Sequence, residues 1–231
     1  MDRSGRIGRL IGAGLYSPGE VERLTGIRVS KIVRWFKGHQ TVDRQYAPLW
    51  SPSIPIKDGK LFLTFRDLTE LRVADAFIRK GLSPQKVRRA IELAQSELGE
   101  ERPLSTAKFR TDGRTIFLQV ASEDGDSERD HLVDLIRSQL AFKRIIEPSL
   151  KDLDFSGNAP SRWWIAGREG HILLDPERSF GRPIEEESSV PTAVLANAYR
   201  AEGTFALAAK AYNVSIASVR RSVEFEQRQA A

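Results

Sequence analysis

The stretch YSPGEVERLTGIRVSKIVRWFK, residues 16–37, decides the fold of the amino-terminal part of this 231-residue chain. Ser17 and Glu20 have the spacing of a capping box, and Pro18 suits the first position of a helix. Gly26 can adopt the positive φ that a tight turn needs. The apolar spacing beyond it predicts a second short helix over 29–37. The stretch therefore predicts two short helices joined by a tight turn.

The outer face of the second predicted helix is polar and basic. A helix that binds DNA specifically must enter a major groove about 12 Å wide and present cations and polar groups to phosphates and base edges. Ser30, which we expect at the helix cap, can reach a phosphate. The alternative is an ordinary helical hairpin with a basic solvent-exposed face. The candidate DNA-binding residues of this helix are Arg28, Ser30, Lys31, Arg34 and Lys37.

Positive charge is concentrated at the same end of the chain. Residues 1–44 contain nine basic and four acidic residues, so their excess equals the whole net charge of +5. A positive end on an otherwise neutral chain is typical of a module that binds a polyanion. Charge, turn and basic helix together predict sequence-specific binding of double-stranded operator DNA.

Residues 46–98 predict a wing and two further helices. The pair Asp58-Gly59 between two short apolar runs is a hairpin signal. In a winged helix-turn-helix, Lys57 and Lys60 at its tip would contact phosphates. Apolar stripes with a 3.6-residue period then predict helices over 66–80 and 83–98.

The middle of the chain, residues 104–155, predicts mixed structure. Asp112-Gly113 favours a second hairpin between segments 108–110 and 115–120. The remaining predictions are a helix over 131–139, a strand over 141–146 and a linker over 154–160.

The last part of the chain predicts two short strands followed by three helices. The strands are expected over 171–175 and 182–184, and the helices over 192–201, 204–211 and 215–227. The second and third of these helices, within 208–221, have the rhythm of another helix-turn-helix. That motif would be either a second contact for DNA or a toxin, or simply a three-helix packing unit. Trp163-Trp164 is either an exposed anchor for a partner or, more commonly, the edge of a core.

The predicted fold class is α+β and mostly helical. Residues 1–100 are expected to form a winged helix-turn-helix DNA-binding domain. Residues 101–160 are expected to form a mixed α/β connecting segment that offers a dimerisation surface. Residues 161–231 are expected to form a helical, helix-turn-helix-like domain.

Composition argues against several functional classes. The chain has no cysteine, which excludes disulfides and thiolate metal sites. It has no apolar run near the roughly 18 residues of a membrane span and no secretory signal, so we expect a cytoplasmic, nucleoid-associated protein. His39, His131 and His171 are scattered, and residues 185–187, Glu-Glu-Glu, are interpreted as a solvated loop. An enzyme, a cofactor or a metal site is therefore not expected.

Residues 15–98 resemble the MerR-type winged helix-turn-helix. MerR-type sensors continue into a long dimerising coiled coil and an effector domain, whereas here Gly99 and Pro103 end the helix. The resemblance implies DNA binding without direct sensing of an effector. The matching features are Tyr16-Ser17-Pro18-Gly19-Glu20-Val21, Trp35 at the end of the second helix, the wing, and the helix pair 65–80 and 83–98.

Residues 171–224 resemble a small helical antitoxin domain that bacteria encode beside PIN-like nuclease toxins. The chain departs from that family at Glu186-Glu187-Ser188-Ser189, where a Gly-Thr-Arg run is common. The matching features are Ile172-Leu173-Leu174-Asp175-Pro176, Phe180-Gly181-Arg182-Pro183-Ile184, Val190-Pro191-Thr192, Gly203-Thr204, Ala208-Ala209 with Tyr212, and Val214-Ser215 with Val219 before Phe225.

The two halves together resemble a VapB-type antitoxin with an amino-terminal DNA-binding domain. The resemblance implies an antitoxin of a type II toxin–antitoxin system, which represses transcription from its own operator and neutralises a PIN-like ribonuclease. Arg220, Arg221 and Arg228 are candidates for the toxin contact, because arginine forms bidentate pairs with the carboxylates of an acidic nuclease site. A homodimer is expected, since one short helix contacts few bases. The alternatives are a stand-alone MerR-like regulator without a toxin and an interaction adaptor that does not bind DNA.

Overall fold

The computed structural model describes residues 12–40, 42–43, 45–123 and 139–230. The fold class is α+β and mostly helical, as predicted. The chain divides into two compact units. Of the described residues, those between 16 and 151 and those over 155–160 form the amino-terminal unit, and those over 12–15, 152–154 and 161–230 form the carboxy-terminal unit. The predicted helix over 131–139 lies almost wholly outside the described residues.

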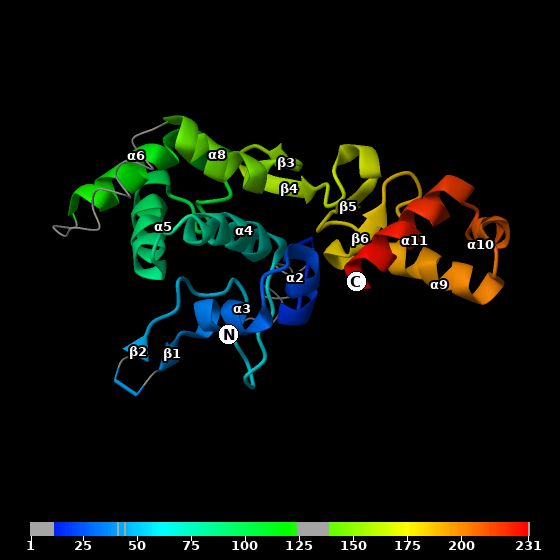
Figure 1. Cartoon of the computed structure of the whole chain (residues 1–231), viewed down its shortest axis with the longest axis horizontal. Helices are drawn as coiled ribbons and strands as arrows, with labels where there is room; N and C mark the ends of the chain where they lie inside the picture. The colour runs from blue at the N-terminus through cyan, green and yellow to red at the C-terminus, as the bar shows by residue number, and fades with distance from the viewer. Residues whose placement is uncertain (1–11, 41, 44, 124–138, 231) are drawn as a thin grey trace, which may run out of the picture. The chain divides into compact units, whose positions relative to one another are not determined.

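The first two helices of the amino-terminal unit, α2 (Pro18–Thr25) and α3 (Val29–Lys37), form as predicted. The capping box is complete, because the Ser17 amide donates to the Glu20 carboxylate over 2.8 Å and the Glu20 amide donates to Ser17 Oγ over 3.3 Å. Gly26 ends α2 with φ of 72°. The two helices follow each other closely in space (Figure 1).

The chain between α3 and α4 (Phe65–Arg79) contains two turns. Strands β1 (His39–Gln40) and β2 (Gln45–Tyr46) pair antiparallel, a hairpin that the sequence did not predict. At the predicted wing, Asp58 and Gly59 have φ of 50° and 71°, and Lys57 pairs with Lys60 in a single β-bridge. The turn is therefore confirmed, but no regular strand flanks it.

Helices α5 (Pro84–Leu98), α6 (Ala107–Glu123) and α8 (Gln139–Leu150) pack with α4. Helices α4, α6 and α8 share a core cluster of phenyl rings, of which Phe77 and Phe117 are closest, with centroids 4.3 Å apart. The predicted hairpin over 108–120 and the predicted strand over 141–146 are therefore wrong, since these residues belong to α6 and α8. The other rings of the cluster are Phe109 and Phe142.

Gly113 lies inside α6, where the absence of a side chain leaves room for the ring of Phe109. A Cβ atom on Gly113 would come within 2.8 Å of the Phe109 ring. The glycine is thus a packing position one turn after Phe109, although glycine usually weakens a helix interior. The Asp112-Gly113 pair consequently marks close packing and not a turn.

The predicted linker over 154–160 is also wrong. These residues belong to β3 (Leu153–Ser156), a turn at Gly157 and β4 (Ala159–Trp163), and β3 pairs with β4. Asn158 of this turn caps the amino-terminal end of α6, although the two segments are 50 residues apart in the sequence. Its carbonyl oxygen accepts from the Ala107 amide over 3.1 Å, and its Oδ1 accepts from the Lys108 amide over 2.8 Å.

The carboxy-terminal unit combines short strands with three helices, as predicted. Within this unit, strand β5 (Ile172–Leu174) pairs antiparallel with β6 (Pro183–Glu185), and Trp163 at the end of β4 pairs with Leu174 of β5. Two 3₁₀ turns, Arg168–Gly170 and Ser179–Gly181, flank β5. The helices are α9 (Thr192–Glu202), α10 (Phe205–Tyr212) and α11 (Ile216–Ala230), grouped together in Figure 1.

The three helices enclose a small core made largely of alanine and valine. Ala208 of α10 and Val219 of α11 are completely buried in it. Trp163 and Trp164 are only 7% and 8% exposed, so they lie at a core edge and are not an exposed anchor. In the part of the chain that the structure describes, no helix is long and apolar enough to span a membrane.

Candidate DNA-binding surface

Helix α3 buries one face and exposes the other. Ile32, Trp35 and Phe36 are buried, and the Phe36 ring meets Trp50 edge to face with centroids 5.0 Å apart. Because this face is fixed by packing, the opposite face must point outward. Arg28, Ser30, Arg34 and Lys37 are exposed there. The expected cap is wrong in one detail: Arg28 is the N-cap residue, and Ser30 lies within the first turn.

Lys31 lies on the same helix but makes internal contacts. Its Nζ donates to Asp75 Oδ1 of α4 over 2.7 Å and lies 4.8 Å from the centroid of the Trp35 ring. The Asp75 side chain is only 7% exposed and also pairs with Arg79 over 2.6 Å. Lys31 thus links α3 to α4, in addition to being a candidate for DNA contact.

The end of α3 is tied to the predicted wing. The Lys37 Nζ donates to the carbonyl oxygen of Gly59, in the turn between Lys57 and Lys60. Both of these lysines are exposed. The contact brings together two of the predicted groups of cations, which are separated by 22 residues in the sequence.

A cavity of about 440 Å³ lies beside α3. Its walls come from α3, the β1–β2 hairpin and the segment after it, the end of α4, and the start of α5. Four of the lining residues are cations, and none is an aspartate or glutamate. The lining residues are Arg28, Ser30, Lys31, Arg34, Trp35, His39, Tyr46, Ala47, Leu49, Ile78, Pro84, Gln85 and Arg88.

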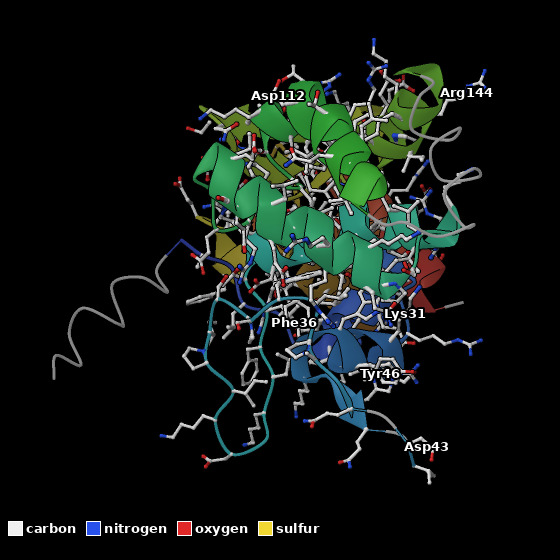
Figure 2. All side chains as sticks on the ribbon, turned by 90° about the vertical axis from the view of Figure 1, so that its left-hand side faces the viewer. Lys31, Phe36, Asp43, Tyr46, Asp112 and Arg144 are labelled. Atoms are coloured by element: carbon white, nitrogen blue, oxygen red, sulfur yellow. The ribbon has the colours of Figure 1, made fainter. Side chains whose placement is uncertain are left out.

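Three of these residues, His39, Tyr46 and Arg88, were missed by the sequence analysis. The rings of His39 and Tyr46 stack across the hairpin with centroids 4.5 Å apart. Tyr46 and Lys31, both labelled in Figure 2, line the same cavity. Arg88 Nε donates to the Pro48 carbonyl over 2.8 Å, which fixes its guanidinium at the rim. The sequence does show a histidine and a tyrosine shortly after the basic helix. It does not show that the two rings stack, because this depends on the register of the β1–β2 hairpin.

Such a concave, cationic and aromatic surface can accept a polyanion. Arginine and lysine side chains bind phosphate oxygens, and an arginine on an exposed helix face can reach guanine edges. Among the candidates, Arg28, Ser30, Lys31 and Arg34 line the cavity. Lys57 and Lys60 lie on the separate turn that Lys37 contacts. The predicted residues of α3 and the turn therefore belong to one continuous part of the amino-terminal unit.

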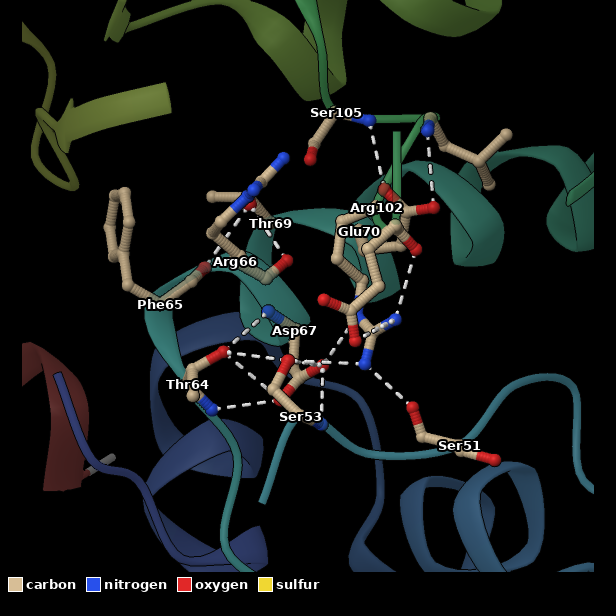
Figure 3. Close-up of polar contacts among 12 residues, drawn as sticks. Ser51, Ser53, Thr64, Phe65, Arg66, Asp67, Thr69, Glu70, Arg102 and Ser105 are labelled. Carbon is tan, nitrogen blue, oxygen red and sulfur yellow. Dashed lines mark hydrogen bonds and ion pairs between the residues drawn. The ribbon is translucent and has the colours of Figure 1, made fainter. Parts of the chain in front are cut away.

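A buried ionic network holds the segment before the turn (Figure 3). Asp67, in the first turn of α4, accepts from Arg102 Nε over 2.7 Å and from Ser53 Oγ over 2.9 Å. Arg102 Nη2 also donates to the Ser51 carbonyl oxygen over 2.6 Å. The chain that leads to the Lys57–Lys60 turn is thus fixed to α4 by a residue that lies beyond α5.

Glu70 lies one turn after Asp67 and is completely buried. Its two carboxylate oxygens accept from the amides of Leu104 and Ser105, over 3.1 and 3.0 Å. Burial raises the pKa of Glu70 to about 7, against the opposing effect of these amides and Arg102. Glu70 therefore fixes the loop between α5 and α6 and titrates near neutral pH.

In the carboxy-terminal unit, the three candidate arginines have different surroundings. Arg221 pairs with Glu185, which is completely buried, and with Glu187 over 3.1 Å. Arg220 is exposed, with its guanidinium 5.5 Å from the centroid of the Phe205 ring, and Arg228 is exposed near the end of α11. Arg221 is thus engaged inside the unit, which leaves Arg220 and Arg228 as the available candidates.

The interpretation of residues 185–187 as a solvated loop is wrong for Glu185. Its carboxylate accepts from the Ser188 amide over 2.9 Å and from Arg221. Burial alone would raise the pKa of Glu185, but the hydrogen bonds from Ser188 and Arg221 outweigh it and hold that pKa below its usual value. The residue is a structural anion that attaches α11 to β6.

No family model matches the chain. A curated protein of Mycobacterium tuberculosis, strain H37Rv, named "Putative antitoxin VapB45", is 28% identical over 223 residues, which cover 91% of this chain and 92% of that protein. Among solved structures, the crystal structure of Rv2018 from Mycobacterium tuberculosis matches with a TM-score of 0.69 at 24% identity. That match covers 90% of this chain and 96% of the solved one. The chain therefore shares its fold, over nearly its whole length, with a mycobacterial protein.

Proposed function

We propose that this chain is the antitoxin of a type II toxin–antitoxin system, which binds its operator as a transcriptional autorepressor and neutralises a PIN-like ribonuclease. The similarity to VapB45 extends over both units, and this supports the antitoxin assignment as a whole. The observation that carries the DNA-binding part is the exposed cationic face of α3, which borders a cavity lined by four cations and no carboxylate.

On this proposal, the amino-terminal unit is a MerR-like winged helix-turn-helix in which α3 enters the major groove. Arg34 is the candidate for a base-edge contact, because it is exposed in the middle of the helix. Arg28 and Lys37, at the two ends of α3, bind phosphates, as do Lys57 and Lys60 on the turn. A homodimer would place two such helices in successive half-sites, about 34 Å apart along the duplex.

The carboxy-terminal unit carries the toxin contact in this proposal. A PIN-like nuclease holds its metal in an acidic pocket, and a guanidinium is a suitable inhibitor because it stays charged and pairs with carboxylates in bidentate fashion. Arg220 and Arg228 are both exposed and could reach such a pocket. Arg221 would act indirectly, since its pair with Glu185 stabilises the base of α11.

Two assays on the full chain test the proposal together. A duplex from the region upstream of the gene is used in a mobility-shift assay, and the neighbouring nuclease reading frame is co-expressed in a growth assay. We expect a specific complex with the duplex and rescue of growth. DNA binding without rescue would indicate a stand-alone regulator, and rescue without DNA binding would remove autorepression from the proposal. Failure of both would contradict it entirely.

A further inference from the structure

We infer that α10 and the first turns of α11 together expose a docking surface for another protein. The contact area of that protein would have an apolar centre surrounded by carboxylates. The inference rests on the proposed function and names the surface by which the antitoxin would hold its toxin. We define the α10–α11 patch by three apolar residues, Leu207, Tyr212 and Ile216, and two cations, Lys210 and Arg220. The three apolar side chains are 50%, 45% and 47% exposed.

The patch differs in chemistry from the DNA-binding candidate on α3, although both follow a helix, a tight turn and a second helix. The exposed positions of α3 are Arg28, Ser30, Arg34 and Lys37. The corresponding first turns of α11 expose Ile216, Ala217 and Arg220. Phosphates are not solvated by isoleucine, leucine or alanine, so this face suits DNA poorly. Apolar and aromatic side chains with an adjacent arginine are typical of the centre of a protein interface.

The geometry beneath the patch is rigid. Asn213 has φ of 51° in the turn, and the Val214 amide donates to the Ala209 carbonyl oxygen over 3.0 Å. Ala208 and Ala209 before this turn and Val219 after it are buried in the core of the three helices. A partner would therefore meet a surface that is already ordered, which lowers the entropic cost of binding.

Arg220 is also held in place before any partner binds. Its guanidinium lies over the ring of Phe205, and this ring stacks on Tyr199 with centroids 4.3 Å apart. Contact with a ring face restricts the arginine without removing its charge. The neighbouring Arg221 pairs with Glu185 and Glu187, so the exposed positive charge of the patch comes from Arg220 and Lys210.

The charge of the segment defines the partner. Residues 203–223 contain three basic residues and no acidic one. Complementary charge across an interface favours encounter and excludes wrong partners, so the partner surface should carry carboxylates around an apolar centre. An acidic metal-binding nuclease meets this requirement. A second copy of this chain would place the cations of one patch opposite those of the other if the same surfaces met around a two-fold axis.

Leu207→Asp and Ile216→Asp in the full chain test the inference. Leu207 is the third residue after the Thr204 cap of α10, and Ile216 is the first residue of α11. A carboxylate is favourable in the first turn of a helix, so both variants should fold. Phe180→Asp is the matched control, because Phe180 is 79% exposed in the same unit but outside the patch.

The neighbouring PIN-like nuclease is titrated against each form by calorimetry. We expect each patch variant to bind it at least tenfold more weakly than the control, with unchanged melting temperature and unchanged affinity for operator DNA. Unchanged nuclease binding would overturn the inference, and the proposed function would still stand. If nuclease binding is intact but DNA affinity is lost, the patch binds DNA and the inference is overturned. If nuclease binding is intact but the dimer becomes a monomer, the patch binds a second copy of the chain, and the inference is overturned as well. If the unaltered chain forms no complex with the nuclease, the proposed function and the inference both fail.

Discussion

Arg102 donates from Nε to Oδ1 of Asp67 over 2.7 Å, and both side chains are buried. The two residues are 35 positions apart, and Asp67 also caps its own helix by accepting from the Thr64 amide over 3.0 Å. One carboxylate thus receives hydrogen bonds from the start of α4, from the segment before the Lys57–Lys60 turn, and from the chain beyond α5. The pair thus connects the segment before the turn to α4, while Lys37 contacts the turn itself.

Arg102→Ala should therefore destabilise the amino-terminal unit strongly. Removing one partner leaves the Asp67 carboxylate buried without its counter-charge, which costs about 3–5 kcal/mol. We expect denaturant unfolding followed by tryptophan fluorescence to show this loss. Arg110→Ala, which removes an exposed arginine from α6, is the control and should change the unfolding free energy by less than about 0.5 kcal/mol. A small loss for Arg102→Ala would show that the pair does not support the fold.

Glu70 should make stability fall as pH rises toward neutral. Burial raises its pKa from 4.5 to about 7 in the folded protein. Between these two values the folded chain keeps a proton that the unfolded chain has lost, so this contribution to stability is complete below pH 4.5. It is lost as pH rises through about 7, by roughly 3 kcal/mol in total.

The variant Glu70→Gln removes this titration. As pH rises from 5 to 8, the unaltered chain loses this contribution and the variant does not. The difference between their unfolding free energies should therefore shift by about 2–3 kcal/mol in favour of the variant. Glu97→Gln, at an exposed carboxylate of α5, should show no such trend. Parallel pH profiles for the Glu70 variant and the unaltered chain would contradict the titration of Glu70 in this range.

Replacing Arg34 should weaken DNA binding alone, whereas replacing Lys31 should also lower the stability of the protein. Arg34→Ala should weaken operator binding by about 1–3 kcal/mol and relax specificity at one base position, because the side chain is exposed on the face proposed to enter the groove. Lys31→Ala should also lower the melting temperature, since it leaves the nearly buried Asp75 without one of its two cations. Mobility shifts at two salt concentrations and thermal melts measure both effects. Normal DNA binding by the double variant would show that α3 is not the recognition helix.

Arg220 and Arg221 are adjacent in sequence but should behave differently. Arg221→Ala leaves the buried Glu185 without its counter-charge and should destabilise the carboxy-terminal unit by about 3 kcal/mol. Arg220→Ala removes an exposed cation whose contact with the Phe205 ring is worth about 0.5–1 kcal/mol at most, so it should lower the unfolding free energy much less. Thermal melts of the two single variants make the comparison. Equal melting temperatures would show that the Glu185–Arg221 pair contributes little to the unit.

The helices at both ends of the chain, and their order, could be predicted from the sequence. The capping box at Ser17, the left-handed Gly26 and the Asp58-Gly59 turn all appear as expected. Each is decided by atoms within about four residues along the chain, where backbone amides meet a neighbouring side chain or a glycine accepts positive φ. Such signals remain valid whatever the rest of the fold does.

The middle of the chain shows where local signals mislead. Asp112-Gly113 has the residue types of a turn, but the Phe109 ring occupies the space of a side chain at Gly113 and the glycine lies inside α6. Thr106 Oγ1 accepts from the Phe109 amide over 3.1 Å and so caps the start of this helix. The buried phenyl cluster outweighs the turn preference of two residues, because packing energy exceeds intrinsic propensity.

The sequence by itself determined the residue types of the candidate DNA-binding surface, namely the exposed cations of α3 and of the Lys57–Lys60 turn. The tertiary structure decided what they are joined to. Lys31 pairs with Asp75 across 44 residues, Lys37 meets Gly59, and Arg88 lies at the rim of the same cavity as Arg34. Periodicity along one helix fixes which face a side chain occupies. Which charge it meets depends on distant segments brought together by burial of the core.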